Sequence, residues 1–200
     1  MKRRTLLIGA SGTAAVLATS YWVTSNNTLQ TASGSDSMQA DDISEDEYPK
    51  LAKDWTEFAP AGQSFPDPSD TLTLSKEDWQ HRLDAAAFDV LREEGTERPF
   101  TSPLNDVKDT GVFVCAGCDL PLFTSAMKFD SGTGWPSFVT KIDGHLETRR
   151  DFKLILPRTE YHCIRCGGHQ GHIFSDGPKP TGQRWCNNGV ALKFVPKTSA

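Results

Sequence analysis

Five cysteines in this chain divide into two groups that suit different chemistry. Four of them form two Cys-x-x-Cys pairs, Cys115/Cys118 and Cys163/Cys166, and the fifth, Cys186, stands alone. Two intervening residues let both sulfurs of a pair face one ion across a tight turn, and four thiolates complete a tetrahedral zinc site. The pairs are far apart in the chain. The ion would therefore join two distant hairpins and have a structural role.

Two other interpretations of the paired cysteines stay open. The pairs can form two disulfides, which an oxidising, exported location would favour. One pair can also be a thioredoxin-like redox motif, but such a motif stands at the start of a helix that follows a strand. No helical pattern follows either pair. The spacing of the pairs therefore favours one structural zinc ion.

The lone Cys186 has polar neighbours at strand spacing. Arg184 precedes it by two positions and Asn188 follows it by two. On an extended strand these three side chains share one face, so a cation and an amide would lie beside the sulfur. A neighbouring guanidinium favours the thiolate, which is the nucleophilic form. A single cysteine in an apolar strand is more often an inert core residue, so the case for catalysis depends on what surrounds it.

Two histidines follow the second cysteine pair. His169 and His172 are three residues apart, and Asp176 is near enough in the chain to orient one of the imidazoles. Histidines beside a metal motif can be ligands, but four cysteines already complete the proposed zinc site. The two imidazoles are then available for proton transfer or for hydrogen bonds to a substrate oxygen.

An aromatic side chain stands in a stiff loop between the two cysteine pairs. Trp135 is preceded by Gly134 and followed by Pro136, which fixes the chain after the indole. An isolated tryptophan of this kind is usually a buried structural residue. Because Cys186 and the histidines are also present, Trp135 is better interpreted as an aromatic wall that receives a small apolar group.

The elements that must position these residues are helical first and then mostly β. Ser75 and Asp78 form a capping box, and apolar residues at helical spacing predict one helix over residues 76–94, closed by Gly95. Beyond residue 98 the pattern changes to short runs typical of strands, broken by Gly, Pro, Asp and Asn. These runs cover residues 111–115, 154–156, 162–164 and 190–195. The sequence predicts a helical start to a mostly antiparallel β domain.

The first part of the chain is different in character. Residues 1–23 combine the basic start Lys2-Arg3-Arg4 with an uncharged stretch, which predicts an export signal of the twin-arginine kind, cleaved after residue 18. An uncleaved membrane anchor is the alternative, because the stretch has about the ~20 residues that a spanning helix needs. Residues 24–70 are predicted to be an acidic, polar linker and N-terminal extension. An exported, periplasmic location follows from the signal.

Composition limits the classes of function. A 200-residue chain with 37% hydrophobic residues suits one globular domain, which we place at residues 71–200. The formal net charge is −5, and the three basic residues near the start are the only charged ones in residues 1–23. Nucleic acids need basic surface, so a nucleic-acid partner is not expected.

The order of these motifs resembles the type B methionine sulfoxide reductases, which act on the R epimer of methionine sulfoxide. The resemblance spans residues 74 to 196, approximately. Besides both cysteine pairs, the matching segments are residues 90–100, 134–138, 169–174, 176–178 and 182–189. Several family members carry Tyr where this chain has Trp185.

The resemblance implies a mainly β fold of two antiparallel sheets with short N-terminal helices, held together by a structural zinc ion remote from the reaction centre. It implies that Cys186 is the nucleophile and that Trp135 receives the methyl group of the sulfoxide, with Phe138 also binding the substrate. The residues that it places around the sulfoxide oxygen and sulfur are His169, His172, Asp176, Arg184 and Asn188.

The expected reaction begins with attack of Cys186 on the sulfoxide sulfur, with His172 donating a proton to the departing oxygen and Arg184 stabilising charge. Cys186 becomes a sulfenic acid. Many family members then form an internal disulfide with a second cysteine, at the position where this chain has Thr133. With four sulfurs on zinc, no spare thiol remains, so the expected reductant is an external thiol such as a thioredoxin-like protein.

Two competing functions remain from the sequence. One is a zinc-containing β binding module in which Trp135 and neighbouring aromatic residues form a cage without catalysis. The other is a thiol peroxidase or redox sensor that uses Cys186. Stereospecific loss of R methionine sulfoxide, coupled to consumption of a thiol, would distinguish the reductase from both.

Overall fold

The computed structural model describes residue 44 and residues 46–152 and 157–197. The predicted export signal, residues 24–43 and 45 of the predicted linker and the predicted strand at 154–156 lie outside these residues. Within the described ranges, no helix has both the length and the apolar character needed to cross a membrane.

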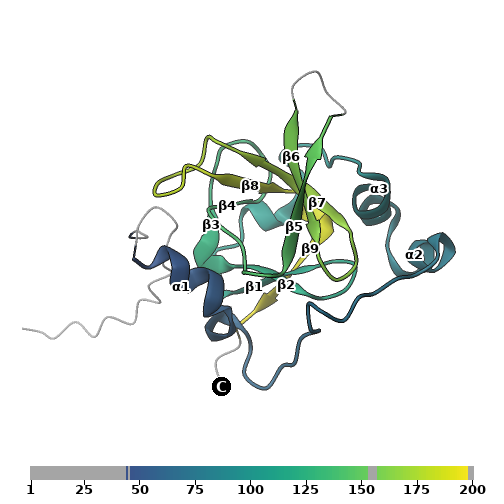
Figure 1. Ribbon diagram of the computed structural model, residues 1–200, viewed down its shortest axis with the longest axis horizontal. Helices are drawn as coiled ribbons and strands as arrows, with labels where there is room; N and C mark the ends of the chain where they lie inside the picture. Colours follow the sequence, from purple (N-terminus) through teal and green to yellow (C-terminus); the bar gives the residue numbers. More distant parts are fainter. Residues whose placement is uncertain (1–43, 45, 153–156, 198–200) are drawn as a thin grey trace, which may run out of the picture. The chain divides into compact units, whose positions relative to one another are not determined.

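Two antiparallel sheets make up most of the fold, as predicted (Figure 1). The first has three strands in the order β2-β1-β9 and the second has six in the order β3-β4-β8-β7-β6-β5. The strands of the first sheet are β1 (Gly111–Cys115), β2 (Pro121–Thr124) and β9 (Leu192–Pro196). Those of the second are β3 (Lys128–Phe129), β4 (Ser137–Phe138), β5 (Leu146–Asp151), β6 (Arg158–Cys163), β7 (His169–Phe174) and β8 (Arg184–Asn187).

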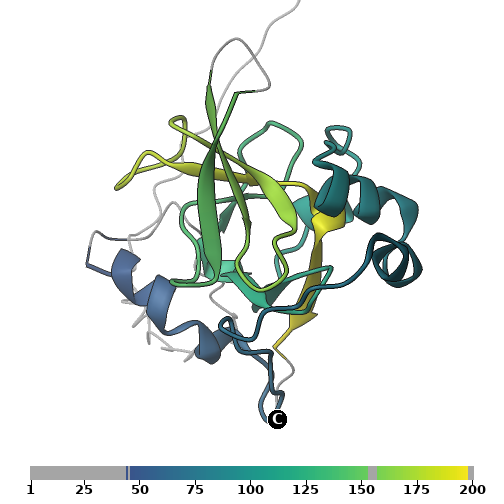
Figure 2. The same cartoon turned by 45° about the vertical axis from the view of Figure 1, so that its right-hand side comes forward.

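Short helices precede and connect the strands. In Figures 1 and 2, α1 lies on one side of the strands and the pair α2 and α3 on the other. The α-helices are α1 (Tyr48–Lys53), α2 (Lys76–Arg82) and α3 (Ala85–Glu93). The 3-10 turns are η2 (Trp55–Phe58), η3 (Pro103–Asn105), η4 (Ser125–Met127) and η5 (Gly189–Ala191).

The prediction of one continuous helix over residues 76–94 is wrong, because the chain breaks between α2 and α3. The Ser75 hydroxyl caps α2 by accepting from the Asp78 amide, as predicted, but Leu83 is extended and Asp84 begins a new helix. The Asp84 carboxylate accepts from the Ala87 N–H at 2.8 Å. An aspartate that binds a main-chain amide in this way competes with continuation of the helix. The left-handed residue that ends α3 is Glu94 and not the predicted Gly95.

The chain packs on the domain before the predicted domain start at residue 71. Leu51 of α1 is 7% exposed and belongs to the hydrophobic core. Tyr48 donates to the Val139 carbonyl at 2.5 Å, and the Leu72 amide donates to the Arg165 carbonyl at 2.8 Å. The packed part of the described chain therefore begins at α1, inside the segment predicted to be a linker.

The core between the sheets is aromatic. Phe123 of β2 stacks on Phe138 of β4 with ring centroids 4.0 Å apart, and it also meets the edge of Tyr161 of β6. Tyr161 contacts Trp185 of β8 at 4.9 Å. Side chains of both sheets thus interdigitate and fix the two sheets against each other. Strands β7 and β8, which carry His169, His172, Arg184 and Cys186, belong to this packed unit.

Candidate active site and metal centre

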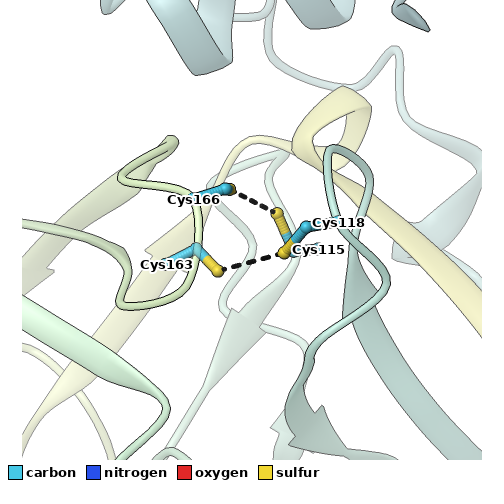
Figure 3. A group of neighbouring side chains, drawn as sticks. All are labelled: Cys115, Cys118, Cys163 and Cys166. Atoms are coloured by element: carbon cyan, nitrogen blue, oxygen red, sulfur yellow. Dashed lines mark hydrogen bonds between the residues drawn. The ribbon is translucent and has the colours of Figure 1, made fainter. Parts of the chain in front are cut away.

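The four paired cysteines meet at one point between the sheets. Cys115 ends β1 and Cys163 ends β6, so each Cys-x-x-Cys turn closes a hairpin, β1–β2 in one sheet and β6–β7 in the other. Figure 3 shows the two turns facing each other with all four sulfurs directed into the space between them. The four sulfur atoms lie within 4.8 Å of one another, and all four residues are buried.

The spacing of the sulfurs fits a metal ion and excludes disulfides in this structure. The Cys115 and Cys166 sulfurs are 3.7 Å apart, and those of Cys118 and Cys163 are 3.5 Å apart. A disulfide bond is about 2.05 Å long, and all five cysteines are free. Zn–S bonds of about 2.3 Å in a tetrahedron place sulfurs roughly 3.8 Å apart. The four thiols could therefore hold one metal ion that joins the two sheets.

A pocket of about 120 Å³ lies on the six-stranded sheet, where the lone cysteine is. Cys186 is partly exposed, unlike the other four cysteines. The residues that line this pocket are Thr96, Trp135, Arg158, Gly171, His172, Phe174, Cys186, Asn187 and Asn188. The structure thus brings together four of the predicted site residues, namely Cys186, His172, Trp135 and Asn188.

Strand pairing explains why Cys186 and His172 meet. In the ladder between β7 and β8 His172 is directly opposite Cys186, and in the ladder between β4 and β8 Cys186 is opposite Ser137. Paired residues of neighbouring strands point to the same face of the sheet. The imidazole and the sulfur are therefore presented to the same pocket.

Burial and a cation act on Cys186 in opposite directions. Burial raises the pKa of the Cys186 thiol above its ordinary value, and the charge and hydrogen bond of Arg184 oppose this rise. Arg184 lowers the pKa of the thiol, as predicted, but burial is the larger effect. The resting form at neutral pH is therefore the thiol. Arg184 is the group that favours the thiolate.

Arg184 is itself held by a carboxylate. Its Nε donates to Asp176 Oδ1 at 2.9 Å and its Nη2 donates to Asp176 Oδ2 at 3.1 Å, and the guanidinium lies over the Phe174 ring. This two-point hydrogen bonding lowers the pKa of the Asp176 carboxyl. The prediction that Asp176 orients an imidazole is wrong in this structure, because its carboxylate orients Arg184 instead.

Each imidazole has a carboxylate partner that the sequence did not indicate. His172 Nε2 is 2.8 Å from Asp151 Oδ2, and His169 Nδ1 is 2.6 Å from Glu160 Oε1. Asp151 ends β5 and Glu160 is in β6, so both come from strands that precede the histidines. Burial lowers the pKa of His172, and the hydrogen bond to Asp151 partly opposes that effect.

A β-bulge brings the two histidine rings together. Residues three apart on a regular strand point to opposite faces, yet the rings of His169 and His172 are 5.3 Å apart. Tyr161 pairs with Gly171 and His162 pairs with His169, so one residue of β7 has no partner in the β6 ladder. The extra residue turns His169 toward Glu160, where it is buried behind His172 and does not line the pocket.

One residue holds both Trp135 and Asn188. The indole N–H of Trp135 donates to the Glu97 carbonyl at 2.9 Å, and the Glu97 N–H donates to Asn188 Oδ1 at 3.0 Å. The Glu97 carboxylate accepts from the Gly189 N–H at 2.5 Å. Glu97 lies in a segment that the resemblance includes, but no local pattern identifies it as part of the site. Only the folded arrangement reveals these contacts.

Phe138 lies away from the pocket. It is fully buried and stacks on Phe123 between the sheets. Because Ser137 is opposite Cys186, the alternation of side chains turns Phe138 to the other face, where it is opposite Trp185. Its predicted role in binding the substrate is therefore corrected to one in packing the core beneath the site.

Thr133, the position without the second cysteine, is close to the site. Its hydroxyl is 3.5 Å from Arg184 Nη1 and 2.8 Å from the Ser131 hydroxyl. The other four cysteines of the chain all belong to the cluster that could hold a metal ion. No other thiol of the described residues therefore lines the pocket with Cys186.

The sequence was also compared with known protein families and proteins, and several are similar to this chain. A family model described as "SelR domain" matches residues 83–196. The peptide methionine sulfoxide reductase MsrB of Agrobacterium fabrum is 46% identical over 129 residues, which cover 64% of this chain and 96% of the relative. The mitochondrial methionine-R-sulfoxide reductase B2 of Rattus norvegicus is 50% identical over 133 residues, covering 62% and 76%. A chloroplastic relative from Arabidopsis thaliana, peptide methionine sulfoxide reductase B1, is 46% identical over 123 residues, covering 61% of each chain.

Proposed function

This chain belongs to the SelR-domain family of type B methionine sulfoxide reductases, and we propose that it reduces the R epimer of methionine sulfoxide in oxidised proteins. The observation that carries the proposal is the position of Cys186 opposite His172 in a pocket with one indole wall. A nucleophile, a proton donor and a surface for a methyl group are the parts that this reaction needs.

The proposed reaction transfers the sulfoxide oxygen to Cys186. The sulfur of Cys186 attacks the sulfoxide sulfur and forms an S–S bond. The protonated oxygen then bonds to the Cys186 sulfur as the S–O bond of the substrate breaks, and cleavage of the S–S bond releases methionine and leaves Cys186 as a sulfenic acid, Cys–SOH. Two electrons pass from the cysteine sulfur to the substrate sulfur. His172 supplies a proton to the oxygen, and Asp151 holds that imidazole at 2.8 Å.

Arg184 has two roles in this scheme. It opposes the effect of burial on the thiol pKa, and its fixed cation stabilises the negative charge that develops on oxygen. Donors aimed at developing oxyanions contribute about 2.7–4 kcal/mol. Asp176 keeps the guanidinium in one orientation by its two hydrogen bonds. Asn188 and Trp135 border the same pocket and position the substrate.

Regeneration requires a reductant from outside the chain. A thiol R–SH condenses with Cys–SOH to give a mixed disulfide and water, and a second thiol releases Cys186 as R–S–S–R forms. We propose a thioredoxin-like protein or another thiol as this partner. The proposal is supported by the position of the other four cysteines, which lie together in the metal centre.

The metal centre is proposed to hold zinc. Four buried sulfurs within 4.8 Å suit a closed tetrahedral site with no open position for a substrate. Cys115, Cys118, Cys163 and Cys166 would bind the ion, whose contribution is to stabilise the contact between the two sheets. Chelation should lower the thermal stability of the chain markedly, and metal analysis should return one zinc per chain.

Turnover assays with Cys186→Ser test the proposal directly. The native chain should consume R but not S methionine sulfoxide as an added thiol is oxidised, and the variant should be inactive with unchanged metal content and melting temperature. Mass analysis after one equivalent of substrate without reductant should show one added oxygen on Cys186. Activity in the serine variant, or oxidation elsewhere, would refute the assignment.

Two further proposals concern other parts of the chain. Export by a twin-arginine-like signal rests on residues 1–23, which lie outside the described residues, and N-terminal sequencing of the native protein tests it. A binding module without catalysis is the second candidate function, favoured only by the indole wall at Trp135. Stereospecific thiol-dependent turnover would reject it.

A further inference from the structure

A chain of buried amide side chains connects the metal centre to the catalytic strand. Gln170 is at its centre, in β7 between His169 and Gly171. It is the residue of the β-bulge that has no partner in the β6 ladder. Its side chain is fully buried in the core. A glutamine in this position must satisfy its hydrogen bonds inside the protein, because an unpaired buried amide is costly.

The side chain of Gln170 reaches in two directions. Its Nε2 donates to Cys115 Sγ at 3.3 Å, and its Oε1 accepts from Asn187 Nδ2, also at 3.3 Å. Asn187 Oδ1 then accepts from the Tyr161 hydroxyl at 2.9 Å. Cys115 belongs to the three-stranded sheet and the other three residues belong to the six-stranded sheet. The amide therefore bridges the two sheets with polar contacts inside an otherwise apolar core.

The main-chain carbonyl of Gln170 holds Asn188, which lines the Cys186 pocket. This carbonyl accepts from the Asn188 N–H at 2.9 Å and from Asn188 Nδ2 at 3.0 Å. Asn187 and Asn188 directly follow Cys186, and both line the pocket. One residue thus touches a sulfur of the metal centre with its side chain and fixes both amides after the nucleophile.

We infer that Gln170 is a positioning residue that couples the metal centre to the Cys186 pocket. A metal-bound sulfur is a charged, fixed acceptor, so the ion orients the Gln170 amide, and the amide in turn orients Asn187 and the strand that carries Cys186. Outer-sphere hydrogen bonds of this kind also tune how tightly the ligand holds its metal. Loss of the Gln170 amide should therefore change both the metal centre and the Cys186 pocket. The inference rests on the proposed metal and on the proposed reactivity of Cys186.

The coupling can be tested with two measurements that do not depend on enzyme turnover. Gln170→Met keeps the volume of the side chain and removes both of its hydrogen bonds. Metal release to a chromogenic chelator should become about tenfold faster, as expected when an outer-sphere partner of a ligand is lost. Alkylation of Cys186 by iodoacetamide, followed by mass spectrometry of that peptide, should change by about threefold or more, within the range of couplings between sites.

Control variants separate coupling from general destabilisation. Ile142→Val shortens a buried core residue outside the amide chain, so it should leave both rates within about twofold. Gln170→Leu also removes the donor to Cys115 and the acceptor for Asn187, and it should speed metal release and alter Cys186 alkylation. It takes the place of the methionine variant if that one does not fold.

A change at one end alone would overturn the inference, since Gln170 would then be only a neighbour of the metal or only a support of the strand. The coupling is equally refuted if neither rate changes, if Ile142→Val reproduces both changes, or if the purified chain holds no metal. Failure of the reductase assay would leave both readouts intact, so the two proposals can fail separately.

Discussion

Replacing Glu97 should damage the site without touching any reacting group. The Glu97 carboxylate accepts from the Gly189 N–H at 2.5 Å and from the Val190 N–H at 3.4 Å. It thereby joins the 96–101 segment to the turn that follows Asn188. In Glu97→Ala the Gly189 amide loses its acceptor, and an unsatisfied amide at a partly buried place costs about 1–3 kcal/mol. For a chain of this size, that corresponds to a fall in melting temperature of about 2–12 °C.

The functional effect should be distinct from the loss of stability. The main-chain groups of Glu97 hold Trp135 and Asn188, and they move when the segment is no longer anchored. A displacement of about 1 Å at a site can cost about 100-fold in rate, so kcat/KM for R methionine sulfoxide should fall by about tenfold or more. The preference for a methyl over an ethyl sulfoxide should also weaken, because the indole wall no longer sets the size of the apolar subsite.

The assays are thermal unfolding and steady-state kinetics on both sulfoxides, well below the melting temperature of each variant. Glu93→Ala is the matched control: Glu93 is in α3, its ion pair with Lys76 is exposed, and such pairs contribute about 0–1 kcal/mol. Glu97→Gln keeps an acceptor oxygen and should recover part of both effects. If Glu97→Ala melts earlier but keeps the kcat/KM and the methyl preference of the native chain, the positioning argument is refuted.

Three further predictions concern single contacts. In Asp151→Asn, the hydrogen bond that raises the pKa of His172 against burial is lost, so His172 should lose its proton at lower pH. The alkaline limb of the kcat profile should then shift to lower pH. An unchanged limb would rule out His172 as the proton donor. In Arg184→Met, the cation that opposes the effect of burial on the Cys186 pKa is lost. The thiol pKa should rise further, and alkylation of Cys186 at pH 7 should become slower. Equal or faster alkylation would contradict this account. Asp84→Ala removes the cap of α3 and should lower the free energy of unfolding by about 1 kcal/mol in urea titrations, with unchanged kcat.

Local spacing was enough to predict the chemistry of the cysteines. A Cys-x-x-Cys turn fixes two sulfurs within a few bonds of each other, so the pairs carried their geometry in the sequence, and the four sulfurs do meet. The strand Gly111–Cys115 was likewise predicted with its observed bounds. The prediction of the helix failed at Asp84 because apolar spacing continues across a capping residue. Periodicity reports which face is buried, and it does not report where the hydrogen-bond ladder stops.

The sequence does not predict which carboxylates on neighbouring strands bind the histidines. Asp151 and Glu160 meet the histidines only because β5, β6 and β7 are neighbours in a certain register. In the sequence, Asp151 follows Arg149 and Arg150, and Glu160 is two residues from Arg158, so both carboxylates look like members of ordinary solvated charge clusters. Asp176 was the nearest carboxylate in the chain to the histidines, so sequence proximity favoured the wrong partner. Arg184 competes for that carboxylate from the adjoining strand β8 and binds it at two points.

The bulge at Gln170 shows why register matters for chemistry. A regular strand would place His169 and His172 on opposite faces, and their spacing of three would then argue against a shared role. One unpaired residue reverses that conclusion and at the same time turns the Gln170 amide toward Cys115. The same insertion therefore sets the support of the catalytic imidazole and the contact with the metal centre. Deleting residue 170 should restore a regular ladder in which His169 and His172 are two positions apart and still share a face. The deletion should therefore break the link to Cys115 while the two imidazoles stay together.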